Sequence, residues 1–340
     1  MLICQWVWRE REQVRDRFTK HNHYNPCAWT ALWNRAYFEM IVSGTRPTTP
    51  ARKQVVFVLN VRSSAIYENT VERVHLDQGL GVAEITPDAM KAFCRRWHPD
   101  RYDDMAEYVK KNAESLFMDF EDILQAVEQM PAYESLIESA RLGGISSPEH
   151  RGFLTCLLII HAMRSHEMMQ AMIDVTDSLG IAKWEYFWLL KNAWSDQALL
   201  VHATRPLACS RWTLYHTDID RFPLCDSPVM IGEHTLMAVI SPRLLLEVDL
   251  KVAGREDEWH VKEYISPSKF REFRRRAIRN SFKEIIFSNC EELELWRSEP
   301  EFRSRVAIMS NSSERKTAIA DAAARVVWAV QGFGRAPSRL

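Results

Sequence analysis

The 340-residue chain lacks the sequence features that mark several large classes of protein. Its seven cysteines are scattered and never form a C-x-x-C pair, which argues against a disulfide framework and against a zinc site built from thiolates. The G-x-G-x-x-G and Walker A patterns are absent, and SHEMMQ departs from H-E-x-x-H because Gln170 stands where the second histidine is needed. The sequence therefore predicts no nucleotide-cofactor motif and no zincin-type metal centre.

Long hydrophobic runs and an excess of one charge are missing as well. The longest apolar run, FLTCLLII, is far shorter than the roughly 20 residues that span a bilayer, and the residues before Arg9 are too few for a signal peptide. Lys and Arg number 44 against 45 Asp and Glu, so binding to nucleic acid or an anionic membrane would need a local patch. These absences favour a cytoplasmic globular protein with reduced cysteines and no membrane partner.

What the chain does have is apolar material for a large core, with 46% hydrophobic residues, 12 Trp and 15 Phe. Short β-branched runs, and apolar residues at helical spacing, mark the expected elements. The predicted helices are 26–40, 87–97, 105–129, 131–142, 148–175, 181–200, 266–287 and one after Ser310. The predicted strands are 54–61, 69–76, 81–85 and an antiparallel meander from Arg211 to Ile265.

These elements predict an α+β fold that is mostly helical, with a central buried helix over 148–175 and helices packed on a small antiparallel sheet. The expected organisation has three parts along the chain. They are an N-terminal extension at 1–20, a single α+β domain at 21–290 and a C-terminal helical tail at 291–340.

The stretch KHNHYNP, residues 20–26, places a histidine just ahead of the first predicted helix. Pro26 suits the first helical position and Asn25 suits the N-cap, so His23 is expected beside a helix N-terminus. The unpaired amides and the macrodipole there favour anions and disfavour imidazolium. We therefore expect His23 to be neutral.

A buried ion pair is expected in the middle of the chain. His161 and Arg164 fall on the apolar stripe of the central helix, and a buried guanidinium needs a carboxylate partner. Asp226, in FPLCDSPVM, is the candidate because Pro228 forces a sharp turn at the end of a strand. A purely structural Arg164–Asp226 pair, joining helices to sheet, is an equally weighted interpretation.

Six short motifs occur in a fixed order along most of the chain. They are HYNP at 23–26, SPEHRGFL, HAMRS at 161–165, FPLCDSPV at 222–229, AVISPRLLL at 238–246 and RAIRNSF at 276–282. This order resembles the bacterial domain of unknown function family 4238, over about residues 20–290. The resemblance implies an architecture and a polar cluster rather than a reaction.

The matched polar positions are His23, Arg164, Asp226, Ser241 and Asn280. The chain departs from the family pattern at two positions: Cys225 stands where the family has serine, and Ser165 stands where threonine and then proline are common. Both departures affect hydroxyl groups, so the resemblance assigns no role to a hydroxyl beside Asp226.

One concentrated basic stretch lies in the helix predicted over 266–287. Its arginines, among them Arg271, Arg275 and Arg279, predict a surface for nucleic acid or a nucleotide. The alternative, a solvated helix face balanced by neighbouring glutamates, is favoured about two to one by the usual behaviour of charged helices.

The stretch HTDID, residues 216–220, places His216, Asp218 and Asp220 at alternate positions. On a strand these side chains would share one face and suit a hard metal, while an Asp-rich turn explains them more simply. The sequence thus predicts no cofactor and leaves a divalent metal open.

The functional expectation is a phosphate-ester hydrolase of nuclease type, in which four side chains line one pocket: His23, His161, Arg164 and Asp226. Arginine would hold the anion, histidine would take a proton from water, and aspartate would orient one of them. Asn25, Ser241 and Asn280 are the expected binding residues. Two alternatives stay open, a non-catalytic module that binds an anion or a partner, and a scaffold whose polar cluster locks the core.

Overall fold

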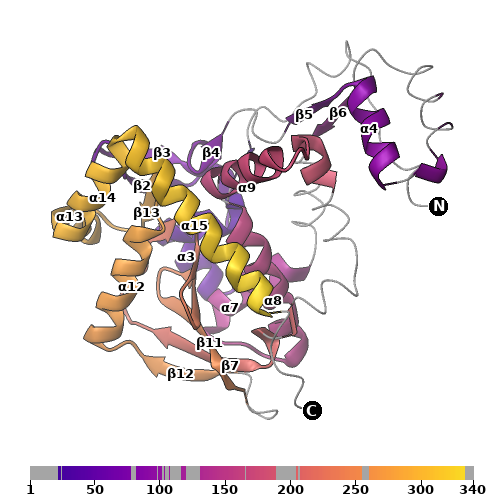
Figure 1. The fold of residues 1–340 in the computed structure, drawn as a ribbon. Helices are drawn as coiled ribbons and strands as arrows, with labels where there is room; N and C mark the ends of the chain where they lie inside the picture. The colour runs from indigo at the N-terminus through magenta and orange to yellow at the C-terminus, as the bar shows by residue number, and fades with distance from the viewer. Residues whose placement is uncertain are drawn as a thin grey trace. The chain divides into compact units, whose positions relative to one another are not determined.

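The computed structural model describes residues 22–23, 25–77, 82–97, 99–101, 103, 107, 116–119, 131–164, 166–188, 204–205, 207–254 and 260–333 (Figure 1). The chain divides into two compact units. The first unit comprises 1–22, 77–127 and 172–196, and the second comprises 23–76, 128–171 and 197–340. The boundaries of these two units differ from the boundaries of the predicted domains. The predicted domain assignment stays a prediction.

The larger sheet of the second unit has five strands in the order β12-β7-β11-β10-β9. The strands are β7 (Ser210–His216), β9 (Val229–Ile231), β10 (Thr235–Ser241), β11 (Leu244–Ala253) and β12 (Val261–Tyr264). Neighbours are antiparallel except β12 and β7, which are parallel. Leu246 of β11 lies opposite Leu214 and Ala238, and all three are buried, so the centre of the sheet forms part of the core.

A second, four-stranded sheet has the order β3-β2-β13-β8. Its strands are β2 (Val55–Asn60), β3 (Ile66–Thr70), β8 (Leu224–Cys225) and β13 (Glu284–Phe287). Ile285 of β13 lies opposite Leu59 on one side and Cys225 on the other. The sheet therefore joins segments from three distant parts of the chain. Two short strands, β1 (Asn22–His23) and β4 (Leu76–Asp77), pair separately.

Helices surround these sheets in the second unit. They are α2 (Cys27–Thr30), η2 (Ala31–Trp33), α3 (Arg35–Val42), η3 (Ala51–Lys53), η4 (Val71–Arg73), α7 (Pro131–Leu142), α8 (Pro148–Met163), α12 (Pro267–Arg279), α13 (Cys290–Ser298), α14 (Pro300–Ser310) and α15 (Ser312–Phe333). Figure 1 shows α15, in yellow, running diagonally from α14 toward α8. Helix α8 is buried along most of its length, as expected for a central helix, and the α+β class is confirmed.

The first unit contains an antiparallel pair, β5 (Val82–Ile85) with β6 (Leu116–Asp119), and helix α4 (Pro87–Trp97) followed by η5 (Pro99–Arg101). Phe93 of α4 packs against Trp184 and Trp188 with ring centroids 4.8 Å apart in both pairs. Nη1 of Arg96 donates to the Gly180 carbonyl and to Glu185, each at 3.1 Å. Aromatic packing and one ion pair thus hold α4 to the helical segment 183–188. Helix α9 (His166–Ser178) contributes residues to both units.

Several predicted elements are confirmed, including the helices at 87–97 and 131–142 and the strands near 54–61 and 81–85. The helix predicted over 105–129 is wrong at 116–119, where the chain forms β6 and pairs with β5. The strand predicted at 69–76 is misplaced, because pairing with β2 ends at Thr70 and η4 follows. The meander is also corrected: β8 belongs to the other sheet, and β12 returns parallel to β7.

Three long predicted helices are interrupted. The one over 26–40 breaks at Asn34, whose side chain caps α3 by accepting the Tyr37 amide at 3.0 Å, while Asn25 makes no such cap. The one over 148–175 divides into α8 and α9 after Arg164, the C-cap of α8. The one over 266–287 ends at Arg279 with Asn280 as its C-cap, and β13 follows because its side chains are buried between β2 and β8.

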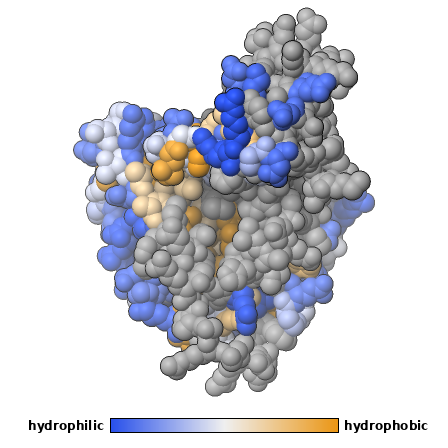
Figure 2. All heavy atoms as spheres, turned by 45° about the vertical axis from the view of Figure 1, so that its right-hand side comes forward, coloured by the Kyte–Doolittle hydropathy of each residue, from blue (hydrophilic) through white to orange (hydrophobic). Residues whose placement is uncertain are grey.

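Among the described residues, no helix is both long enough and apolar enough to cross a membrane. Hydrophilic side chains cover much of the coloured surface in Figure 2, and apolar side chains gather mainly in its upper part.

Candidate functional site

The predicted pair His161 and Arg164 meets at the hydroxyl of Tyr133, which α7 supplies. Nη1 of Arg164 donates to the Tyr133 oxygen at 3.0 Å, and that oxygen lies 2.6 Å from Nε2 of His161. One hydroxyl thus lies within hydrogen-bond distance of both a guanidinium and an imidazole nitrogen. Burial, and then the neighbouring charge of Arg164, hold the pKa of His161 well below its usual range. His161 and Arg164 are 1% and 2% exposed, so this cluster lies in the core.

Asp226 holds the start of β13. Its fully buried carboxylate accepts the backbone amides of Phe282 at 3.1 Å, Lys283 at 2.5 Å and Glu284 at 3.2 Å. Its own amide donates to the Glu284 carbonyl at 3.2 Å. Three amides around one carboxylate satisfy a buried negative charge and fix the turn that leads into the strand.

Asn25 lies beside the Asp226 loop rather than at a helix cap. Its amide nitrogen donates to the Cys225 carbonyl at 3.2 Å and lies 2.8 Å from Nδ1 of His75. Burial raises the pKa of the Cys225 thiol to about 12, so this thiol is neutral at physiological pH. Asn25 and Cys225 thus contribute to the packing around the Asp226 turn.

The other expected residues are distributed over the second unit. Ser241 is buried, and its oxygen accepts the Arg243 amide at 3.3 Å in the turn between β10 and β11. His23 lies in β1, and its side chain is outside the described residues. Asp220, one of the metal candidates, pairs with Arg243 at 2.6 Å, while Asp218 is exposed. Within the described part of the chain, no group of three His, Cys, Asp or Glu side chains is placed to hold a metal ion.

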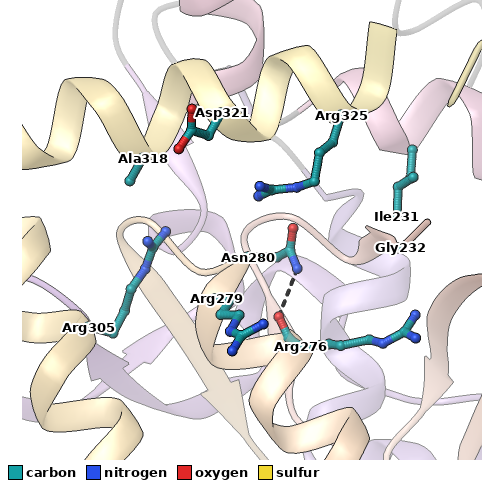
Figure 3. Close-up of a pocket in the computed structure, with 9 residues that line it drawn as sticks. All are labelled: Ile231, Gly232, Arg276, Arg279, Asn280, Arg305, Ala318, Asp321 and Arg325. Atoms are coloured by element: carbon teal, nitrogen blue, oxygen red, sulfur yellow. Dashed lines mark hydrogen bonds between the residues drawn. The ribbon is translucent and has the colours of Figure 1, made fainter. Parts of the chain in front are cut away.

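Asn280 marks a different site, an arginine-lined cleft of about 510 Å³ in the second unit (Figure 3). The lining residues are Ile231, Gly232, Arg276, Arg279, Asn280, Arg305, Ala318, Asp321 and Arg325. They come from β9 and the chain after it, the end of α12, α14 and α15. Four arginines and a single acidic residue therefore line one cavity.

Helix α12 places its arginines by its amphipathic pattern. Phe270, Phe273, Ala277 and Ile278 are buried and fix the rotation of the helix, which leaves Arg279 exposed at its end. The side-chain amide of Asn280 donates to the Arg276 carbonyl at 2.8 Å and satisfies a helix C-terminal group. The orientation of the cleft side of α12 is thus set by core packing.

Two of the four arginines are anchored by protein groups. Nη1 of Arg276 donates to the Thr235 hydroxyl at 2.6 Å, and Nη2 pairs with Glu272 at 2.7 Å. Nε of Arg305 donates to the Ser281 carbonyl at 2.9 Å.

The shape of the protein around each anchored arginine keeps it in place. A Cβ atom at Gly232 would lie 2.8 Å from Nη1 of Arg276, so glycine makes room for this guanidinium. Arg305 also lies over the Phe282 ring, 5.0 Å from its centroid. Anchored arginines are pre-organised, which lowers the entropy lost when an anion binds.

The other two arginines, Arg279 and Arg325, are exposed and make no ion pair or side-chain hydrogen bond with any other described residue. In Figure 3 the Arg325 side chain extends from α15 into the space above Asn280. Asp321, one turn earlier on α15, supplies the lone carboxylate of the lining. The cleft thus has a local positive charge although the whole chain is nearly neutral.

The cleft adjoins the segment that contains Asp226. A cavity of about 10 Å³ shares Ile231, Asn280 and Arg325 with the cleft and is also lined by Ser227, the residue after Asp226. The motifs FPLCDSPV and RAIRNSF therefore meet in space, through the Asp226 contact with Phe282 and through this small cavity. The structure brings Asn280 close to the Asp226 loop, and it joins His161 and Arg164 at Tyr133.

Sequence reasoning missed Arg305 and Arg325 as members of one site with the arginines of α12. The basic run of α12 was visible, but Arg305 and Arg325 lie in helices that the sequence marks only as a tail. No short-range pattern links them to α12, because the link depends on how α14 and α15 pack.

No family model, no curated protein and no solved structure matches the chain. The resemblance to the domain of unknown function family 4238 therefore stays a prediction, and the function has to be inferred from the geometry of the site.

Proposed function

We propose that the protein binds a phosphate-bearing anion in the arginine-lined cleft. The observation that supports this function is the pair Arg279 and Arg325, two exposed guanidinium groups at one cavity that make no ion pair with any other described residue. Guanidinium groups form paired, charge-assisted hydrogen bonds with phosphate oxygens. Arg276 and Arg305, held by their protein contacts, add two positive charges in fixed positions.

Binding of tripolyphosphate to the purified chain, measured by titration calorimetry, tests the proposal. We expect Arg279→Gln and Arg325→Gln each to weaken binding by about tenfold or more, since charge-assisted hydrogen bonds are the stronger kind. Arg46→Gln is the matched control, because Arg46 is exposed, loses the same charge and lines no part of the cleft. Equal affinities for all four proteins, or no heat of binding for the unsubstituted chain, would contradict the proposal.

Phosphate-ester hydrolysis through His23, His161, Arg164 and Asp226 stays a separate, untested hypothesis. Two of these side chains have structural roles: His161 shares a hydrogen bond with Tyr133 in the core, and Asp226 accepts three backbone amides of the β13 turn. Incubation with phosphate mono- and diesters, with and without divalent metals, would test turnover directly. The bacterial origin and cytoplasmic setting expected from the sequence also stay predictions.

A further inference from the structure

Helix α12 is bordered by three cavities that share residues from one to the next. The cleft shares Arg276 and Arg279 with a second cavity of about 360 Å³, which is also lined by Arg271 and Arg275. The second cavity shares Arg271 with a third, of about 530 Å³. We call this series of neighbouring cavities along α12 the α12 trough. It is lined by more arginines than one phosphate group needs.

The arginines along the trough are regularly spaced. Arg271, Arg275 and Arg279 are four residues apart, so they lie on one face of α12 with a rise of about 6 Å between neighbours. A ligand with charges repeated along its length can contact all three.

The side chains of Arg271, Arg275 and Arg279 are available to bind an anion. Arg271 and Arg279 make no ion pair with any other described residue, and both side chains are exposed. Arg275 pairs with Glu301 at 3.3 Å, but both side chains are largely exposed, so a phosphate can replace this partner. Glu272 is engaged by Lys269 and Arg276. The row therefore retains positive charge toward solvent.

An aromatic side chain lies at the far end of the trough. Tyr264 lines the third cavity and is 57% exposed, although its ring packs edge-on against His216 at 5.3 Å. A large exposed ring beside a row of cations is the arrangement on which unpaired bases stack. Binding of a phosphate group would not by itself require the aromatic side chain of Tyr264.

We propose that the ligand of the α12 trough is single-stranded nucleic acid, an inference that rests on the anion-binding function proposed for the cleft. The arginines contact successive phosphates and Tyr264 stacks on one base. Arginine is the commonest residue of the lining, and Asn280 is its single side-chain amide, so binding is governed by the backbone and only weakly by sequence.

Fluorescence anisotropy tests the nucleic-acid inference, with the full chain and a labelled oligouridylate of about 12 nucleotides. This length is in the range of known single-strand binding sites. A duplex of the same length, ATP and tripolyphosphate serve as competitors. We expect the single strand to bind more tightly than the duplex or ATP. The logarithm of its affinity should fall with the logarithm of salt concentration with a slope of about −2 to −3, as for three or four phosphate contacts.

Variants outside the cleft separate this inference from the anion site. Arg271→Gln should weaken oligonucleotide binding several-fold and reduce the salt slope by about 0.7, while leaving tripolyphosphate binding unchanged. Tyr264→Ala should weaken oligonucleotide binding on the order of 5- to 150-fold, and Tyr264→Phe should retain it. Arg46→Gln is again the control for charge. Both test residues are exposed, so thermal melting should match the unsubstituted chain.

Each outcome decides one of the two proposals. Tripolyphosphate binding without oligonucleotide binding, a duplex that binds as tightly as the single strand, or unchanged affinity in Arg271→Gln and Tyr264→Ala would overturn the nucleic-acid inference alone. If the unsubstituted chain bound neither the oligonucleotide nor tripolyphosphate, this inference and the proposed anion site would both be overturned.

Discussion

The phenol oxygen of Tyr133 lies 2.6 Å from Nε2 of His161, and this contact ties α7 to α8 in the core of the second unit. The same oxygen accepts from Arg164 at 3.0 Å, so one hydroxyl contacts Nε2 of the imidazole and Nη1 of the guanidinium. Removal of the hydroxyl takes this contact from two buried nitrogen atoms.

Tyr133→Phe should therefore lower the free energy of unfolding by about 1–3 kcal/mol, the cost of leaving buried polar groups without a hydrogen bond. Urea denaturation followed by circular dichroism measures it. Tyr264→Phe removes a hydroxyl from an exposed ring and should change stability by less than about 0.5 kcal/mol. Equal effects of the two substitutions would show that the Tyr133 hydroxyl contributes no net stability.

The depressed pKa of His161 predicts a pH dependence of stability. In the unfolded chain this imidazole gains its proton near its ordinary pKa of 6.5, while the folded state resists protonation until well below that pH. The unfolded state therefore binds more protons in this window, and stability falls as pH drops below about 6.5, by up to about 1.4 kcal/mol per pH unit. His161→Gln should flatten this part of the curve in denaturation series from pH 8 to pH 5. If stability fell with pH in the same way in His161→Gln and in the unsubstituted chain, His161 would not be the source of this pH dependence.

Removal of the Asp226 carboxylate should destabilise the β13 turn. We expect Asp226→Ala to cost at least about 3 kcal/mol, because three backbone amides lose a charged acceptor in a dry environment. Asp226→Asn keeps one acceptor oxygen and should cost less. Asp218→Ala, at an exposed position, is the control. If Asp226→Asn and Asp226→Ala both left the free energy of unfolding unchanged, the three amides would have to bind water or other partners at no cost in stability.

Cysteine reactivity should follow burial. The thiols of Cys209 and Cys290 are exposed, whereas Cys94 and Cys225 are buried with raised pKa values, about 12 in the case of Cys225. Pulses of iodoacetamide at pH 8, followed by mass spectrometry, should label the first two thiols before the second two. Labelling of all four at one rate in the absence of denaturant would contradict the packing around the Asp226 loop.

The lone carboxylate of the cleft offers a gain-of-binding test. Asp321→Asn removes the single acidic side chain among the residues that line the cleft, so tripolyphosphate should bind more tightly, by a few-fold in low salt. The gain should shrink as salt rises, because exposed charges are screened over about 8 Å at physiological ionic strength. Unchanged or weaker affinity for Asp321→Asn would argue that the anion does not occupy this cleft.

Local patterns predicted much of the fold. The helices at 87–97 and 131–142 begin at prolines, and their apolar spacing is strong, so their bounds could be predicted closely. The strand at 284–287 was missed because Phe282 and Ile285 continue the helical spacing of α12, and only pairing with β2 and β8 decides the outcome. Tertiary contacts override periodicity where a short apolar run suits either structure.

The candidate site was predictable only in part. The row Arg271, Arg275 and Arg279 is evident from its spacing on one helix, and burial of Arg164 and Asp226 follows from their apolar surroundings. Arg305 and Arg325 join the site through the packing of α14 and α15, which no local pattern encodes. Likewise, the contact of the Tyr133 hydroxyl with His161 could not be foreseen, because Tyr133 comes from another helix.

The position of β13 between β2 and β8 has a consequence for biosynthesis. The hairpin of β2 and β3 leaves the ribosome early, yet its inner edge has no neighbour until residues 284–287 have been translated. An unpaired strand edge is a template for incorrect association. Nascent chains of this protein should therefore depend on chaperones until most of the polypeptide has emerged, and truncation before residue 284 should give aggregates rather than a smaller folded protein.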